Sequence, residues 1–205
     1  PSTPSTGNTD TDGWKQLSDG SWQYRQNGRP VSGWQTIEGK SYVFNSAGVM
    51  QTGWYQENGK WFYLGSSGTM RTGWQEIDHK WYYLNTDGSM ATGWLKSQNV
   101  WYYLKADGSM ATGWLHEGGV WYWLYDWGGM ANTAWVKVNG AWYYFRGNGR
   151  MHTGWLQLES NWYYLTSTGA MTANRWHWVG NHCYYFYESG VMAASTTVNG
   201  YRVDN

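Results

Sequence analysis

Tryptophans that recur in pairs are the residues of this sequence whose type and spacing could do chemistry. Trp54 is followed seven residues later by Trp61, and the same spacing recurs at Trp94 and Trp101 and along most of the chain. Aromatic ring faces attract cations, and rings without a paired carboxylate suit a bulky cation that donates no N–H hydrogen bond, such as a quaternary ammonium group. Three rings at about 0.5–2 kcal/mol each, less the cost of association, predict millimolar affinity for one site. Several sites would bind a polymer that repeats the cation more strongly than one site does.

The composition argues against several other classes of partner. The 205 residues include 19 Trp, 18 Tyr and 4 Phe, while 14 Lys and Arg balance 14 Asp and Glu. This balance provides no basic field for nucleic acid or for an anionic membrane surface, so we expect neither as a partner. No apolar run approaches the roughly 20 residues that span a bilayer, so we expect no membrane insertion. Cys183 is the only cysteine and cannot form a disulfide within the chain.

A repeat of about 20 residues must position these tryptophans. Each unit begins with a Gly or Ala followed by a leading Trp, except the last, which begins with Arg175 and Trp176. From Trp34 onwards, a Met follows sixteen residues after each leading Trp. Pairs such as Asn58-Gly59 are typical of two-residue hairpin loops whose central residues have positive φ. An isolated hairpin is marginal in water, so the units must stack on their neighbours. The sequence therefore predicts an all-β solenoid of stacked β-hairpins.

The turn position predicts which residues of a hairpin share a face. Counting from the leading Trp, residue 0 pairs with +9, +1 with +8 and +2 with +7, and directly opposed residues share a face. The face that carries both tryptophans also carries polar residues at +2, such as Lys96, which indicates a wet face that could meet a ligand. The opposite face is predicted to be core, with Tyr82 and Leu84 in one repeat and Tyr102 and Leu104 in the next.

The repeat unit resembles those of a known family. The pattern Gly-Trp-x6-Trp-Tyr-Tyr-Leu-x3-Gly-x-Met-x-Thr occupies residues 73–92 and 93–112. It is similar to the choline-binding repeats of pneumococcal and phage surface proteins, and the resemblance covers about residues 13–194. It implies a left-handed solenoid that holds choline or phosphocholine of wall or lipid-linked teichoic acid. It also implies a secreted protein of the bacterial cell surface or cell wall, or a phage lysin acting there.

The resemblance further implies which residues form each site. In the family, a site combines both tryptophans of one repeat, the Met that follows them and an aromatic residue of the next repeat. Carried onto this sequence, the predicted choline-binding sets are Trp54, Trp61, Met70 and Tyr83; Trp74, Trp81, Met90 and Tyr103; Trp94, Trp101, Met110 and Trp123; Trp114, Trp121, Met130 and Tyr144; Trp135, Trp142, Met151 and Tyr164; and Trp155, Trp162, Met171 and Tyr185.

The terminal repeats depart from the family pattern. Ser41 and Cys183 stand where the second Trp is expected, and the repeat led by Trp14 is followed by Val43 in place of the third ring. We therefore expect these units to bind poorly or not at all and to act as caps. Two junctions have one extra residue, near Trp127 and near Asn174, and we expect a changed rotation between the neighbouring hairpins there.

The repeats also define the expected domains and leave little room for catalysis. Residues 1–12, rich in Ser, Thr and Pro, are predicted to be a disordered linker, residues 13–194 the repeat solenoid and residues 195–205 a C-terminal capping hairpin. No catalytic constellation emerges, so we expect a non-catalytic module, and any activity would belong to a separate domain. We expect no cofactor. His177 and His182 flank Cys183 without the spacing of a four-ligand metal site, so no metal is expected.

Two further questions stay open at this stage. Aromatic repeats of glucan-binding domains stack their rings on sugars, and residues 33–52 look more like that group, so a carbohydrate-binding (glucan) module is the alternative function. Some family members form homodimers through their last hairpins, and residues 184–187 are a run of aromatics that could serve that role here.

Overall fold

The fold is described from a computed structural model in which residues 11–203 are placed. The predicted linker at residues 1–12 therefore lies almost wholly outside the described residues, as do the last two residues of the predicted capping segment. The chain divides into two compact units, each described by itself. One comprises the residues up to Gly93 together with Leu104–Met110, and the other comprises Trp94–Tyr103 together with the residues from Ala111 onwards.

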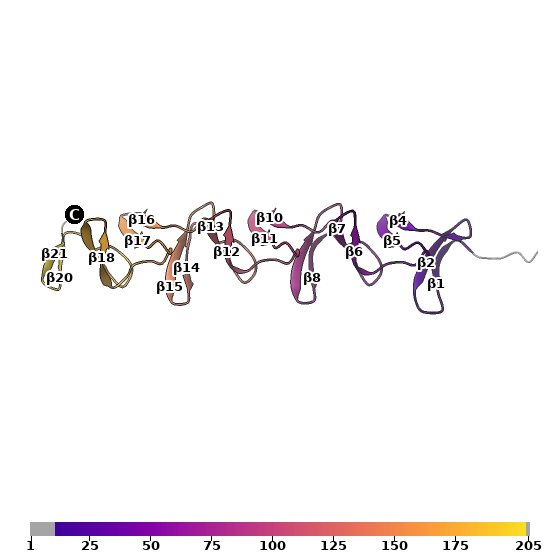
Figure 1. The fold of residues 1–205 in the computed structure, drawn as a ribbon, viewed down its shortest axis with the longest axis horizontal. Helices are drawn as coiled ribbons and strands as arrows, with labels where there is room; N and C mark the ends of the chain where they lie inside the picture. Colours follow the sequence, from indigo (N-terminus) through magenta and orange to yellow (C-terminus); the bar gives the residue numbers. More distant parts are fainter. Residues whose placement is uncertain (1–10, 204–205) are drawn as a thin grey trace, which may run out of the picture. The chain divides into compact units, whose positions relative to one another are not determined.

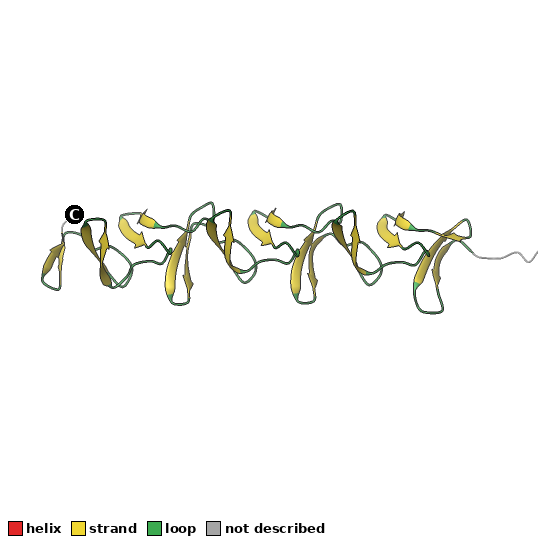
Figure 2. Ribbon diagram, viewed as in Figure 1, coloured by secondary structure: helices red, strands yellow, loops and turns green. Residues whose placement is uncertain are grey.

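Within residues 11–203 the regular structure consists of strands, without a helix, as Figure 2 shows. Correspondingly, no helix that could cross a membrane is found in this part of the chain. Successive strands pair as antiparallel hairpins that follow one another in chain order within each unit (Figure 1). This arrangement confirms the prediction of an all-β chain of successive hairpins.

The strands are short, and most have five residues. They are β1 (Gly13–Gln16), β2 (Trp22–Gln26), β3 (Arg29–Pro30), β4 (Gly33–Ile37), β5 (Lys40–Phe44), β6 (Gly53–Glu57), β7 (Lys60–Leu64), β8 (Gly73–Ile77), β9 (Lys80–Leu84), β10 (Gly93–Ser97), β11 (Val100–Leu104), β12 (Gly113–Glu117), β13 (Val120–Leu124), β14 (Ala134–Val138), β15 (Ala141–Phe145), β16 (Gly154–Leu158), β17 (Asn161–Leu165), β18 (Arg175–Val179), β19 (His182–Phe186), β20 (Thr196–Val198) and β21 (Tyr201–Val203). The last pair shows that a hairpin closes around Asn199-Gly200.

The register within the hairpins is the one that the turn chemistry predicts. In β6 and β7, Trp54 pairs with Tyr63 and Gln56 pairs with Trp61, which are the expected 0 to +9 and +2 to +7 pairs. The turn residues Asn58 and Gly59 have φ values of 50° and 75°, as a two-residue loop of this kind requires. The same register recurs in the hairpins led by Trp74, Trp114, Trp135, Trp155 and Trp176.

Each methionine joins its own hairpin to the preceding one. Met90 forms a β-bridge with Leu84 of its own repeat. Its backbone N–H also donates a hydrogen bond of 2.7 Å to the carbonyl of Trp61, the second tryptophan of the repeat before. Equivalent bonds recur along the chain. Within each unit, the methionine backbone therefore ties successive hairpins together, and it brings Met90 beside the tryptophan pair of the earlier repeat.

The core is thin: most hairpins contribute one fully buried large apolar residue, and some add a second buried one, such as Ile37, Val136 or Leu156. Leu64, Leu84, Leu104, Leu124 and Leu165 are fully buried, and Phe145 and Phe186 occupy the equivalent position. The predicted core position of Leu84 and Leu104 is confirmed. Tyr82 and Tyr102 were also predicted to be core, but both are only half-buried.

Candidate functional site

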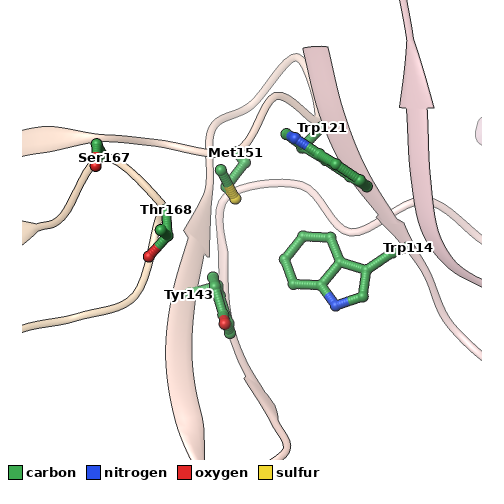
Figure 3. A pocket seen from close by; sticks show the side chains of 6 residues that line it. All are labelled: Trp114, Trp121, Tyr143, Met151, Ser167 and Thr168. Carbon is green, nitrogen blue, oxygen red and sulfur yellow. The ribbon is translucent and has the colours of Figure 1, made fainter.

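Pockets lie where two hairpins meet, and the one led by Trp114 shows their construction. Trp114 and Trp121 come from β12 and β13, whereas Tyr143 and Met151 come from the next repeat. Their side chains surround a cavity of about 480 Å³, which Figure 3 shows from close by. The Trp114 ring lies 5.8 Å from that of Trp121 at an interplanar angle of 86°, and 4.8 Å from that of Tyr143 at 80°. The rings therefore form walls at steep angles to one another and leave a concave apolar space.

Backbone contacts hold these four side chains in place. The N–H of Met151 donates a hydrogen bond of 2.9 Å to the carbonyl of Trp121, so the thioether lies against the second indole. Trp114 is half-buried and is also packed against Trp123, 5.3 Å away across its own hairpin. Trp121 stays 44% exposed, which leaves part of that indole open to a ligand.

A turn from a third repeat completes the rim. Ser167 and Thr168 line the Trp114 pocket from the loop after β17. The next residue, Gly169, has a φ of +83°, and a Cβ atom on it would meet the Sδ atom of Met151 at 2.3 Å. Only glycine combines this backbone conformation with this close approach. The small residue lets the turn rest directly on Met151, the residue between the rings.

The same arrangement recurs in both compact units, and each pocket is named here by its leading tryptophan. The volumes are about 440 Å³ for the Trp14 pocket, 340 Å³ for the Trp54 pocket, and 220 Å³ each for the Trp94 and Trp135 pockets. Their linings are Trp14, Trp22, Tyr42, Met50, Ser66 and Ser67; Trp54, Trp61, Tyr82, Met90, Ala106 and Asp107; Trp94, Trp101, Tyr122, Met130 and Asn148; and Trp135, Trp142, Tyr163, Met171 and Ser189.

Rings are grouped in the same way at the repeat led by Trp155. Trp155 lies 6.0 Å from Trp162 and 4.8 Å from Tyr184, and the N–H of Met192 donates a hydrogen bond of 2.8 Å to the Trp162 carbonyl. The predicted pair Trp74 and Trp81 also lies together, with ring centroids 6.4 Å apart.

The structure keeps the predicted tryptophan pairs together but gives them different partners. At the Trp54 pocket the third ring is Tyr82 rather than the predicted Tyr83, and the methionine is Met90 rather than Met70. The residue at +8 lies on the face that meets the preceding hairpin, whereas the residue at +9 stays beside its own leading Trp, as Tyr83 does 5.3 Å from Trp74. The same shift moves Trp123, Tyr144, Tyr164 and Tyr185 out of their predicted sets in favour of Tyr122, Tyr143, Tyr163 and Tyr184.

The methionines shift by one whole repeat for the same reason. Met90, predicted with Trp74 and Trp81, lines the Trp54 pocket instead, and its amide is bonded to Trp61. Met110, predicted with Trp94 and Trp101, donates its N–H to the carbonyl of Trp81. Likewise, Met130, Met151 and Met171 line the Trp94, Trp114 and Trp135 pockets, each one repeat earlier than predicted.

The first repeat is more complete than the sequence reasoning allowed. Val43 was expected in the place of the third ring, but it is fully buried, and Tyr42 supplies the ring instead. Tyr42 lies 4.9 Å from Trp14, so the Trp14 pocket has all the components of the others. The signal that could have identified it was the aromatic at +8, which is present after every tryptophan pair.

Two repeats have incomplete walls. At Trp34, Ser41 replaces the second indole, and the Trp34 Nε1–H donates a hydrogen bond of 2.9 Å to the Glu57 carboxylate. At Trp176 the second indole is replaced by Cys183, which pairs across the hairpin with Trp178. The residue of the next hairpin at the third-ring position, by register, is Val203. These repeats lack the ring set of a complete pocket.

Charge at the pockets is sparse and differs between them. Among the described residues that line the five pockets, Asp107 carries the one carboxylate, at the Trp54 pocket. The Ser109 hydroxyl and amide donate hydrogen bonds of 2.6 and 3.0 Å to Asp107, and they hold the pKa of that carboxyl below its usual value. The carboxyl is therefore ionised at neutral pH.

One buried histidine supports a leading tryptophan. The Arg146 Nε–H donates a hydrogen bond of 2.8 Å to His152 Nδ1, so the proton of the neutral ring lies on Nε2, 2.8 Å from the Trp155 carbonyl. Burial lowers the pKa of His152 from its ordinary value, and the Arg146 charge lowers it further, against the opposing effect of the bond to Trp155. In the folded chain, where its ring bonds to Trp155 at the start of β16, His152 is therefore neutral at neutral pH.

Comparisons with known proteins agree with this architecture. A family model described as choline-binding repeat matches residues 31–72, 71–108 and 132–176, more than half of the chain. A second, described as putative cell wall binding repeat, matches residues 112–130 and 174–192. No match was found among curated proteins.

Solved structures from Streptococcus pneumoniae are similar over most of this chain. CbpJ is 29% identical over 94% of this chain and 98% of its own, with a TM-score of 0.75. CbpF in complex with ipratropium is 33% identical over 90% of this chain and 74% of its own, with a TM-score of 0.74. The choline-binding domain of CbpL is 34% identical over 85% of this chain and 94% of its own, with a TM-score of 0.66. The chain therefore belongs to the family of proteins built from choline-binding repeats.

Proposed function

We propose that this chain is a non-catalytic module that attaches to the bacterial cell wall by binding the choline groups of wall polymers in its aromatic pockets. The observation that carries the proposal is the repeated pocket of two indoles, one tyrosine and one methionine contributed by two successive hairpins. Such a pocket offers ring faces and a polarizable sulfur to a methylated cation, and it offers few hydrogen-bond acceptors.

The affinity of each pocket is expected to be low, and the affinity of the chain is expected to come from their number. Three rings contribute about 1.5–6 kcal/mol in total, from which the cost of association is subtracted, so millimolar binding is expected. A polymer that repeats choline can engage several pockets at once, because each further contact is then intramolecular. Teichoic acid with choline substituents has this chemistry, and it would place the protein at the cell surface.

Carbohydrate binding is the alternative, and the ring geometry disfavours it. A sugar that stacks on an aromatic side chain needs an open, flat face. In the Trp54 pocket the rings of Trp54 and Trp61 stand at 90°, and those of Trp54 and Tyr82 at 69°. These angles enclose a compact group and provide no extended platform, which favours a trimethylammonium group over a pyranose.

Titration of the chain with choline and, separately, with dextran tests the proposal. Tryptophan fluorescence should change with choline at millimolar concentration and stay unchanged with dextran. Trp121→Phe should remove part of the choline response. Trp178→Phe is the matched control, because Trp178 is 68% exposed and lines none of the five pockets. No response to choline at about tens of millimolar, or a response to dextran alone, would refute the proposal.

Pairing of two copies through the last hairpins is part of the same proposal. Trp176, Tyr187 and Tyr201 are exposed there, and the rings of Trp176 and Tyr201 lie 6.1 Å apart; large exposed apolar side chains in a group are typical of contact surfaces. Sedimentation velocity at increasing concentration, with and without choline, measures this directly. A Trp176→Ser and Tyr201→Ser double variant should remain monomeric if the hairpins form the contact.

A further inference from the structure

The residue opposite the second tryptophan is a lysine at two of the pockets. Lys137 pairs across the hairpin with Trp142, and its Nζ atom lies 5.8 Å from the centroid of that ring. Lys96 stands at the same repeat position, and its Nζ atom lies 6.0 Å from the Trp101 ring centroid. Trp142 and Trp101 are walls of the Trp135 and Trp94 pockets. Each of these pockets thus has an ammonium group within cation–π distance of one of its own walls.

The Trp54 pocket has a different set of charges in its surroundings, an acidic rim residue with Lys80 and Lys105 close enough to lower its pKa further. Gln56 pairs with Trp61 there, and the rim carries the ionised Asp107. The rims of the two lysine pockets are formed instead by the neutral residues Asn148 and Ser189. An acidic group also lies near the Trp94 ring: Glu117 accepts a hydrogen bond of 2.9 Å from the hydroxyl of Tyr103, whose ring lies 5.2 Å from Trp94. The pocket linings therefore differ in charge while the rings stay the same.

A ligand's charge decides how it responds to these groups. Bare choline is a cation, and an ammonium group near the same ring repels it. In a choline ester of phosphate, only two carbons separate the quaternary ammonium from the anionic phosphate. When the ammonium is in the pocket, the phosphate therefore lies just outside the mouth. Both lysine side chains are exposed and flexible enough to meet it there. A carboxylate at the rim instead attracts the choline cation and repels the phosphate.

We propose that Lys96 and Lys137 make the Trp94 and Trp135 pockets select choline that carries a phosphate over bare choline, and that the Trp54 pocket, with Asp107 at its rim, lacks this preference. The inference rests on the proposed function, because it assigns a specificity to pockets that the function requires to bind choline.

The effect on each pocket is modest and measurable. Exposed ion pairs change an equilibrium constant by roughly 1.4- to 5-fold, and the repulsion of bare choline acts in the same direction on the ratio of the two affinities. We expect the ratio of phosphocholine affinity to choline affinity to be about 2- to 10-fold higher at the lysine pockets than at the Trp54 pocket in low salt. The difference should shrink in about 0.5 M NaCl, because the Debye length then falls to a few ångström.

Site-resolved NMR of the indole N–H groups tests the proposal on the full chain. Resonances of Trp101, Trp142 and Trp61 are assigned by single Trp→Phe variants and followed during titration with choline, phosphocholine and glycerophosphocholine. The last compound separates a phosphate diester, as found in a polymer or a lipid headgroup, from the free monoester. Lys96→Gln and Lys137→Gln should lower the affinity ratio at their own pockets by about 2- to 5-fold. Glutamine is chosen because Gln56 occupies the equivalent position in the Trp54 repeat.

One reciprocal double variant and one control complete the design. Gln56→Lys combined with Asp107→Asn should raise the ratio at Trp61 to that of the lysine pockets. Lys40→Gln makes the same charge change away from the residues that line the pockets and should leave all ratios unchanged. Equal ratios at all three indoles, or ratios that do not move in the lysine variants, would overturn this inference alone. Indoles that respond to none of the three compounds would overturn the proposed function, and this inference with it.

Discussion

Exchanging the two neighbouring tyrosines of β9 for leucine, one at a time, tests how the pockets are assembled. Tyr82 lies 4.9 Å from Trp54 and lines its pocket, whereas Tyr83 lies 5.3 Å from Trp74 and does not. Loss of one ring face removes about 0.5–2 kcal/mol of cation binding. Tyr82→Leu should therefore raise the dissociation constant for choline at the Trp54 pocket by about 2- to 30-fold, and Tyr83→Leu should change it by less than about 2-fold.

The assay must resolve the pocket and exclude general unfolding. The indole N–H of Trp61 reports the Trp54 pocket, and that of Trp142 reports a pocket in the other compact unit, which serves as the internal control. Near-ultraviolet circular dichroism checks that both variants stay folded. A loss of affinity at Trp61 in Tyr83→Leu with none in Tyr82→Leu would refute the assignment of the +8 ring. Such a result would restore the grouping that the sequence pattern predicts.

Three further changes test other parts of the structure. Gly169→Ala should lower the free energy of unfolding by about 1–3 kcal/mol in chemical denaturation, because φ is positive there and the new Cβ meets Met151. Gly154→Ala is the control and should cost less, since Gly154 has a similar φ but nothing within 4 Å of the added Cβ. Equal losses in the two variants would contradict the role of the Met151 contact. The pKa of His152 is lowered in the folded chain, so the unfolded chain takes up the proton first as pH falls. The free energy of unfolding should therefore fall as pH drops below about 6.5, and His152→Ala should flatten that dependence. An unchanged slope in the variant would contradict this role of His152. Ser41→Trp should add the missing indole to the wall of the second repeat and create one more choline-responsive indole resonance. If no such resonance appears, the missing second Trp does not explain why that repeat is incomplete.

Local pattern was sufficient to predict each hairpin. The Asn58-Gly59 pair sets a two-residue loop, and the loop fixes that Trp54 faces Tyr63 and Gln56 faces Trp61. The apolar residue at +10 had no polar alternative in any full repeat, which identified Leu84 as core. These predictions depend on residues within about ten positions of one another, where turn chemistry and strand alternation act directly.

The partners between hairpins could not be obtained in this way. Tyr82 and Tyr83 are adjacent and chemically identical, so composition alone does not distinguish the ring that faces the preceding repeat from the one that stays in its own. The choice is made by the distance and rotation between hairpins, which depend on the bond from the Met90 amide to the Trp61 carbonyl. That bond is invisible in a hydrophobic pattern. Tyr82, which walls a pocket, stays half-exposed, whereas Tyr42 at the equivalent position of the Trp14 pocket is buried in a core cluster as well.

A pocket in this fold is therefore a property of three successive repeats. The tryptophans of the Trp135 pocket belong to one repeat, Tyr163 and Met171 to the next, and Ser189 to the turn of the one after that. The quality of a repeat's own sequence is then a poor guide to its binding, as Trp14 and Trp22 illustrate: their pocket is complete because Tyr42 and Met50 follow. At Trp176 two deficits coincide: Cys183 replaces the second indole of the repeat itself, and the hairpin after it has Val203 at the register position of the third ring, although the Tyr201 ring lies 6.1 Å from Trp176. Removing hairpins from the C-terminal end should accordingly abolish pockets whose tryptophans are still present.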